Sequence, residues 1–282
     1  MSNIEISRRG SLSVLGAAAI APMPAAAQSL RLLDLSKRED FFDAVLKMRA
    51  SKDEKMRMGF IVGRYYGSMA ATMTPLFGMI AGTFSKFRKL PDGRYEGISY
   101  ELAYFTDWDT GELLTTFKNP LNGKTVKVEQ LMRIGPSRTY YSPGHFEESP
   151  DRLPPGLKRT HRILPARVVG DDVWFVEENF VKPDPDAKVK LSFGEVSTFH
   201  SSLKALSDPA APHAPTDVHF TMNIGWRPWL EMGDTPGHLF AAGTGKFVER
   251  IEDMPQDFLS LARKYSADDI KDPAAMLAEA TF

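Results

Sequence analysis

Hydrophobic and polar positions repeat with two different periods along the chain, and the change of period separates helical ends from a β-rich middle. Near the beginning, Phe42, Val45 and Leu46 recur at helical spacing, with charged residues on the opposite face. Ser36 and Glu39 form the S-x-x-E pattern of a capping box. The pattern predicts an amphipathic helix over residues 36–50.

The middle of the chain, from residue 58 to residue 247, alternates short β-rich runs with turn signals. Pro91-Asp92-Gly93, Asn122-Gly123 and Gly170-Asp171 each separate two such runs. About ten strands are expected, and no amphipathic helix is placed to serve as a repeated crossover. This predicts a mainly β protein, either a single antiparallel β-barrel or a strongly bent sheet. A calycin- or lipocalin-like barrel of this size can hold one small ligand.

Helical periodicity returns near the end of the chain. Phe258, Leu261 and Tyr265 share one face of a predicted helix, and Asp272-Pro273 is typical of the N-cap and first position of a last short helix. No internal repeat divides residues 28–282. We therefore expect these residues to form a single β-barrel-like domain, closed by the helix over 36–50 and by the short C-terminal helices.

The first 27 residues have the pattern of an export signal. Arg8 and Arg9 precede a short apolar stretch, and the run Ala25-Ala26-Ala27 fits the small-residue rule for cleavage after residue 27. The apolar stretch is about half as long as a bilayer span requires. The arginine pair resembles a twin-arginine signal, although Ser11 replaces the usual Phe, and an ordinary secretory signal is the alternative. We expect a periplasmic or secreted protein that uses the twin-arginine export machinery.

Composition narrows the classes of function. The 282 residues are 43% hydrophobic and 25% charged, which is ordinary for a soluble globular protein, and the formal net charge is −1. Nucleic-acid binding is not expected, because such proteins usually carry a basic excess. No apolar run after residue 28 is long enough for a stable membrane anchor. The absence of cysteine excludes disulfides and thiolate chemistry.

The sequence contains no complete cofactor or metal motif. The stretch AGTGKF lacks both the first glycine and the Ser or Thr of a phosphate-binding loop, and neither G-x-G-x-x-G nor G-x-S-x-G occurs. The six histidines form neither H-x-H nor H-x-x-x-H. We therefore expect no metal and no cofactor.

Glu101 is the first candidate for chemistry. Both faces of its predicted strand, over residues 95–105, are mostly apolar, and a carboxyl group on a covered strand needs a partner or its pKa rises. The functional interpretation is a general acid or base that faces a cavity, with Arg64 or Arg138 as an oxyanion or carboxylate partner and Tyr66 as a hydrogen-bond donor. The structural alternative is a salt bridge from Glu101 to one of these arginines.

His200 is the second candidate, because an imidazole titrates near neutral pH. Its structural alternative is a hydrogen-bonded histidine at a strand end. Asn223 belongs to a polar strand face that either lines a wet cavity or faces solvent. Tyr104 and Trp174 belong to the aromatic residues of the β region, which we expect to contact an apolar ligand.

The stretch GWRPWLEMGDTPG is the most distinctive of the chain. Trp226 and Trp229 bracket Arg227 and Pro228. The two indole rings either cover one end of the barrel or contact a ligand. Arg227 either stacks between them or holds an anion.

Three motifs carry a resemblance to a known family. They are a Tyr-rich strand followed by D-x-x-T-G-E-x-L over residues 104–113, an N-P-x-x-G turn over 119–123, and W-x-P-W-L-x-M-G-D-x-P-G over 226–237. The sequence resembles the family called domain of unknown function 1838 over most of residues 28–282. The resemblance implies an exported protein or one associated with secondary metabolism, and it carries no assigned reaction.

Three functions are compatible with the sequence. The first is a cofactor-independent lyase, dehydratase or isomerase that acts on a bulky apolar molecule, aromatic, terpenoid or steroid-like, with Glu101 and His200 as acid and base. The second is a carrier that binds such a molecule without transforming it. The third is an interaction module without a pocket.

The export signal can be tested directly. Replacing Arg8 and Arg9 together with lysine keeps the positive charge but removes the arginine pair that twin-arginine export requires. We expect unprocessed precursor to accumulate inside the cell, measured by immunoblotting of cell fractions. Normal processing of this variant would instead identify an ordinary secretory signal.

Overall fold

A single antiparallel sheet accounts for most of the β-rich middle of the chain. The computed structural model describes residues 31–142, 145–148, 156–186 and 192–279, so the predicted signal over residues 1–27 lies outside the described residues. Within these ranges eleven strands pair in one sheet, and two more form a separate hairpin. The eleven strands are β1 (Arg57–Met69), β2 (Thr72–Lys89), β3 (Tyr95–Thr106), β6 (Met132–Ser142), β7 (His145–Glu148), β8 (Leu157–Ile163), β9 (Arg167–Val169), β10 (Asp172–Pro183), β11 (Phe193–Ser202), β12 (Asp217–Ile224) and β13 (His238–Val248).

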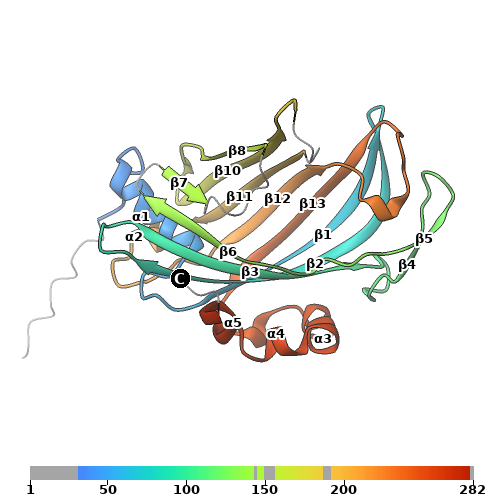
Figure 1. Ribbon diagram of the computed structural model, residues 1–282. Coiled ribbons are helices and arrows are strands. Elements are labelled where there is room, and N and C mark those ends of the chain that lie inside the picture. The colour runs from blue at the N-terminus through green and yellow to red at the C-terminus, as the bar shows by residue number, and fades with distance from the viewer. Residues whose placement is uncertain (1–30, 143–144, 149–155, 187–191, 280–282) are drawn as a thin grey trace, which may run out of the picture. The chain divides into compact units, whose positions relative to one another are not determined.

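Strands that follow one another in the chain mostly lie side by side, in two groups that meet between β1 and β13. The strand order is β7-β6-β3-β2-β1-β13-β12-β11-β10-β8, and β9 also pairs with β10. The sheet curls strongly into a half-barrel (Figure 1). The prediction of a mainly β, antiparallel fold is therefore confirmed, in its bent-sheet form. The described residues belong to one compact unit.

Glycines line the contact between β1 and β13. The register runs from Met58 opposite Val248 to Ser68 opposite His238. A Cβ atom on Gly63 would lie 2.7 Å from the carbonyl oxygen of Ala242. One on Gly243 would lie 2.8 Å from the carbonyl oxygen of Val62. Glycine within a strand is typical of a close backbone approach or a tight bend, and here it lets the two strands meet where the sheet curls.

Three helices cover the convex face of the sheet. Figure 1 shows α3 (Gln256–Tyr265), α4 (Ala267–Lys271) and α5 (Pro273–Glu279) below the curled strands. They pack on outward-facing residues of β1, β2 and β3, which include Met58, Ile80, Phe84, Ile98, Tyr100, Leu102 and Tyr104. None of the helices in the described ranges is long and apolar enough to cross a membrane.

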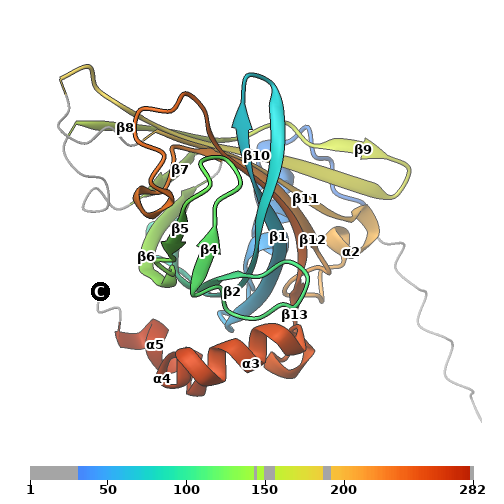
Figure 2. The ribbon, with the colours of Figure 1, turned by 90° about the vertical axis from the view of Figure 1, so that its right-hand side faces the viewer.

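The two ends of the concave face are filled by different elements, which Figure 2 shows from one end. At one end, α1 (Arg38–Arg49) packs through Val45 and Met48 on β10, β11 and β12 and through Phe42 and Leu46 on β2 and β6. The short α2 (Leu203–Ser207) adds Leu206 to the first of these contacts.

At the other end lie the hairpin of β4 (Thr116–Lys118) and β5 (Thr125–Lys127) and the 3₁₀ turn η2 (Pro228–Leu230). They pack on an aromatic cluster, which we define as Tyr65, Phe77, Phe105 and Trp229. The centroids of neighbouring rings in this cluster are 5.1–5.8 Å apart. The last 3₁₀ turn, η3 (Ile251–Asp253), leads from β13 to α3.

The structure confirms two of the predicted turn and cap signals and contradicts a third. Asn122-Gly123 lies in the turn between β4 and β5, with Gly123 at a φ of 75°, and Asp272 accepts a hydrogen bond from the backbone N–H of Ala275 at 3.0 Å, as expected of an N-cap. The predicted capping box is wrong. The hydroxyl of Ser36 donates to Asp34 instead, at 2.6 Å, and α1 begins two residues later. Lys37 takes the N-cap position with no side-chain hydrogen bond, so α1 begins without the reciprocal Ser–Glu contacts of a capping box.

The attachment of α3 to the sheet can be tested by two substitutions. A Cβ atom on Gly82 would lie 2.2 Å from Cζ of Phe258, a ring that is fully buried. Phe258→Ala should lower the free energy of unfolding by about 3–5 kcal/mol, and Gly82→Ala by about 1–3 kcal/mol. In the double variant the clash is absent, so Gly82→Ala should cost much less there. Urea denaturation measures all three.

Tyr265→Ala, on the more exposed side of the same helix, is the matched control. It should change the free energy of unfolding by about 1 kcal/mol or less. Additive effects of Gly82→Ala and Phe258→Ala would contradict the packing of α3 on β2.

Candidate functional site

The middle of the concave face carries polar and charged side chains between the two apolar ends. On β10, Glu177 and Asn179 continue the face of Phe175, which packs on α1. On β11, Ser197 and Glu195 continue the face of Phe199 and lie opposite Glu177 and Asn179. We call the whole set the concave polar cluster: Arg49, Tyr65, Glu101, Arg159, His161, Glu177, Asn179, Glu195, Ser197 and Arg227.

One half of the cluster is a network around Glu177. The guanidinium of Arg49, the last residue of α1, pairs with Glu177 and also lies over the ring of Phe199, 4.9 Å from its centroid. Nε2 of His161, on β8, contacts the other oxygen of Glu177. Nε of Arg159 donates to Oδ1 of Asn179 at 2.7 Å. Burial, followed by the charges of the two arginines, lowers the pKa of His161 to about 3. The imidazole is therefore neutral at physiological pH.

Glu195 is the carboxyl group with the most unusual surroundings. It lies deep between the strands, yet part of its surface remains accessible. The hydroxyl of Ser197 donates to its Oε1 at 3.0 Å. Burial raises the pKa of Glu195, and the hydrogen bond from Ser197 and the charges of Arg49 and Arg159 offset only part of that rise. Glu195 therefore keeps its proton at a higher pH than an ordinary glutamate does.

Tyr65, on β1, interacts electrostatically with charged groups from three other segments of the chain. Its side chain is buried, and burial raises the pKa of its hydroxyl to about 12. The charge of Arg227 opposes that rise, while the charges of Glu101 and Glu195 add to it. These three groups, from three different segments, therefore lie close enough to the phenol to act on it electrostatically. Tyr65 is a neutral hydrogen-bond donor at physiological pH.

A model of one protein family, described as protein of unknown function (DUF1838), matches residues 63–266. The chain belongs to the DUF1838 family. Comparison with curated proteins and with solved structures finds no match. The region shared with other DUF1838 members contains every residue of the concave polar cluster except Arg49.

Three of the residues expected at a site do lie on the concave side. Glu101 is half-buried on β3, on the face of Ala103 and Phe105. Trp229 is buried in the aromatic cluster. Trp226 packs beside that cluster, and its indole N–H donates to the carbonyl of Thr235 at 2.9 Å.

The arginines expected beside Glu101 lie on the other face of the sheet. Arg138 pairs with the buried Glu96 at 3.1 Å. Arg64 lies over the ring of Trp108, 4.7 Å from its centroid, and 5.9 Å from that of Tyr66. Arg64, Tyr66 and Arg138 therefore do not face Glu101. The expectation that one of these two arginines pairs with Glu101 is corrected, because neighbouring residues of a strand point to opposite faces.

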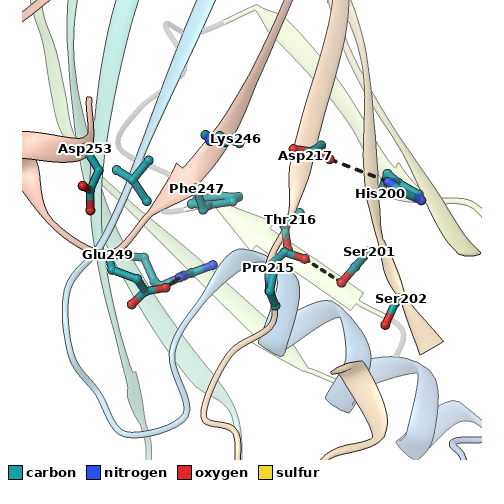
Figure 3. A pocket seen from close by; sticks show the side chains of 12 residues that line it. His200, Ser201, Ser202, Pro215, Thr216, Asp217, Lys246, Phe247, Glu249 and Asp253 are labelled. Carbon is teal, nitrogen blue, oxygen red and sulfur yellow. Dashed lines mark hydrogen bonds and ion pairs between the residues drawn. The ribbon is translucent and has the colours of Figure 1, made fainter. Parts of the chain in front are cut away.

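His200 is also on the convex side, so it does not form an acid–base pair with Glu101. Its Nε2 lies 2.8 Å from Oδ1 of Asp172, its Nδ1 lies 3.8 Å from Oδ2 of Asp217, and its ring stacks on that of Trp174 at 5.0 Å. The same histidine borders an open surface pocket of about 670 Å³ near the ends of β11, β12 and β13 (Figure 3). Phe247 contributes an apolar part of that pocket.

The remaining two expected residues also lie outside the concave polar cluster. Tyr104 is fully buried under α3 and donates to the hydroxyl of Ser266 at 2.8 Å. Asn223 is exposed on the outer side of β12, opposite to the buried Met222. Of the two interpretations of this polar strand face, the structure supports the one in which it faces solvent.

Sequence reasoning missed most of the concave polar cluster. One signal was present: Glu195 and Ser197 alternate with Val196 and Thr198 and continue to Phe199, so their face runs into a core position. No local signal indicated Arg49 or His161, because they belong to a helix and a strand that meet only through the curl of the sheet.

The neutral state of His161 predicts a pH dependence of stability. Its pKa is about 3 in the folded protein and near 6.5 in the unfolded chain, so its contribution is present above pH 6.5 and is lost as the pH falls toward 3. Between pH 7 and pH 4, wild type should lose roughly 3 kcal/mol more free energy of unfolding than His161→Gln. Urea denaturation at several pH values measures this difference.

His219→Gln removes an exposed histidine on β12 and serves as the control. Its stability should follow that of wild type at every pH. If the free energies of unfolding of wild type and His161→Gln instead fall in parallel as the pH is lowered, the pKa of His161 is not lowered in the folded protein.

Proposed function

We propose that the concave face binds a small organic molecule and catalyses proton transfer on it, as a lyase, dehydratase or isomerase that uses its own side chains. The observation that carries the proposal is Glu195, an accessible carboxyl group deep in the sheet whose pKa is raised by burial. A carboxyl group that stays accessible while burial raises its pKa is typical of a general acid. Stability alone gives no reason to place one there, because a buried carboxyl group costs free energy.

The proposed roles follow from the surroundings of each group. Glu195 donates a proton to the leaving oxygen or to the developing carbanion. Glu101, on β3 across the curl of the sheet from β11, takes a proton from the substrate. Tyr65 lies within the electrostatic range of both and donates a hydrogen bond to a carbonyl or hydroxyl oxygen.

The apolar part of the substrate would lie against partly exposed side chains that pack on the aromatic cluster, such as Ile61 and Phe193. Tyr65 belongs both to this cluster and to the concave polar cluster, so the two adjoin. An aromatic, terpenoid or steroid-like body fits such a wall, because aromatic rings bury large apolar areas. Binding without turnover, as in a carrier, is the competing function.

We further propose that this activity takes place outside the cytoplasm. The proposal is supported by Arg8-Arg9 and by the small residues that precede Gln28. Export through the twin-arginine machinery would deliver the protein already folded.

The role of Glu195 is tested with a panel of hydroxylated and carbonyl-containing aromatic, terpenoid and steroidal compounds. Thermal shift identifies binders, and mass spectrometry detects their conversion. Glu195→Gln keeps the shape and a hydrogen-bonding group but removes the proton donor. Turnover of a converted compound should fall by about 10²–10⁴, with binding retained.

Glu178→Gln is the matched control, because Glu178 is the neighbour of Glu177 on β10 and pairs with Arg162 on the convex side. It should leave turnover unchanged. Compounds that bind without any conversion would favour the carrier. If Glu195→Gln keeps the turnover of wild type, this carboxyl group does not take part in the reaction.

A further inference from the structure

Two buried donors of one short segment have no acceptor among the described residues. They are Nε of Arg227 and Nε1 of Trp229, which flank Pro228 at the start of η2. The side chain of Trp229 is only 7% exposed. A buried N–H group nearly always has a hydrogen-bond partner, because leaving it unpaired loses the bond that it made with water. Both atoms therefore indicate an acceptor that the described chain does not supply.

Among the described residues, Arg227, which is half-buried, also lacks the counter-charge that Arg49 and Arg57 have. Arg49 pairs with Glu177, and Arg57 pairs with Glu249. Within the described ranges Arg227 forms no salt bridge, and its recorded neighbour is the neutral phenol of Tyr65. A half-buried cation without a counter-charge still loses part of its hydration, so this side chain favours an anion.

The segment that carries the two donors is held firmly in place. The side-chain amides of Asn119 and Asn122 both donate to the carbonyl of Leu230 at 3.0 Å. Trp226 is fixed by its hydrogen bond to Thr235. Trp229 and Tyr65 both contact the rings of Phe77 and Phe105. Donors on a fixed segment bind a ligand without a further cost of ordering.

We propose that Arg227, Trp229 and Tyr65 form a subsite for a carboxylate, so that the ligand of the concave face is a monocarboxylic acid with a hydrophobic body. The proposal rests on the proposed function for the location of the ligand and adds its chemical class. A planar guanidinium matches the two oxygens of a carboxylate, and the indole N–H and the phenol are further donors. The single charge of Arg227 and the nearby Glu101 favour one negative charge over two.

The test compares acids with their uncharged analogues. The probes are 4-phenylbutyrate, 6-phenylhexanoate and decanoate, each paired with its primary amide, which has nearly the same shape. Isothermal titration calorimetry on the chain from Gln28 onward, at pH 7.5, gives the ratio of the dissociation constants of amide and acid. For wild type we expect at least one pair to show a preference of about tenfold or more for the acid.

Arg227→Gln should abolish this preference, and Trp229→Phe, which keeps a ring but removes the indole N–H, should reduce it several-fold. Arg64→Gln is the matched control. Nε of Arg64 is also buried without a partner in the described structure, but its guanidinium lies on the convex face over Trp108. It should leave the preference unchanged. Absence of any preference in wild type, or its survival in Arg227→Gln, would overturn the subsite.

The subsite and the proposed function fail in different ways. Glu195→Gln should keep the preference for acids, because the carboxyl group is not part of the subsite. Acid binding through Arg227 without conversion of any acid would leave the subsite standing and the proposed catalysis refuted. Conversion of neutral compounds, with no preference for acids, would support the proposed catalysis and refute the subsite.

Discussion

The pairing of β1 with β13 is the interaction on which the rest of the structure depends. It joins the first and last strands of the sheet, which are far apart in the sequence, from Met58 opposite Val248 to Ser68 opposite His238. Two meanders that are each local in the chain thereby become one sheet. Glycines such as Gly63 and Gly243 allow the backbones to approach where a Cβ atom would not fit. The resulting curl gives the sheet two different faces. The C-terminal helices cover the convex face, and on the concave face the strands of the two meanders lie opposite one another.

That curl determines the electrostatics of the concave face. Side chains of β3 and β11 act on the same phenol across it, although four strands lie between them in the sheet. Most of the buried groups are paired or neutral: Glu177 has Arg49, the imidazole of His161 is uncharged, and Tyr65 keeps its proton. Arg227, which is half-buried and forms no salt bridge within the described ranges, and Glu195 are the exceptions, and such unbalanced ionisable groups are often functional.

The family motifs meet in space at one end of the concave face. Asn119 and Asn122, from the N-P-x-x-G turn, hold the carbonyl of Leu230, in the middle of the Trp-rich motif. Asn119 is fully buried, which is unusual for an amide and is explained by these hydrogen bonds. The two motifs therefore act as one structural unit, and what this unit positions is Arg227 and Trp229.

The sequence by itself determined the fold class, the turns and the two faces of each strand. Its alternation correctly separated Glu101 from Tyr104, and its Asn-Gly and Asp-Pro signals located the β4–β5 turn and the start of α5, because such preferences act between residues close in the chain. The failed capping box at Ser36 shows the limit even there, since the helix begins at Arg38 with Lys37 as its N-cap.

Only the tertiary structure decided which face of each strand is concave and which charges meet on it. His200 lies on β11 and Glu101 on β3. The alternation of residues along each strand would be the same whichever way the sheet curls, so the sequence could not show that these two side chains point to opposite faces. Arg49, His161 and Glu177 come together from α1, β8 and β10, and their meeting depends on strand order and curl, which are properties of the whole sheet. Periodicity reports the two sides of a strand, whereas the long-range pairing of β1 with β13 decides which side becomes the interior.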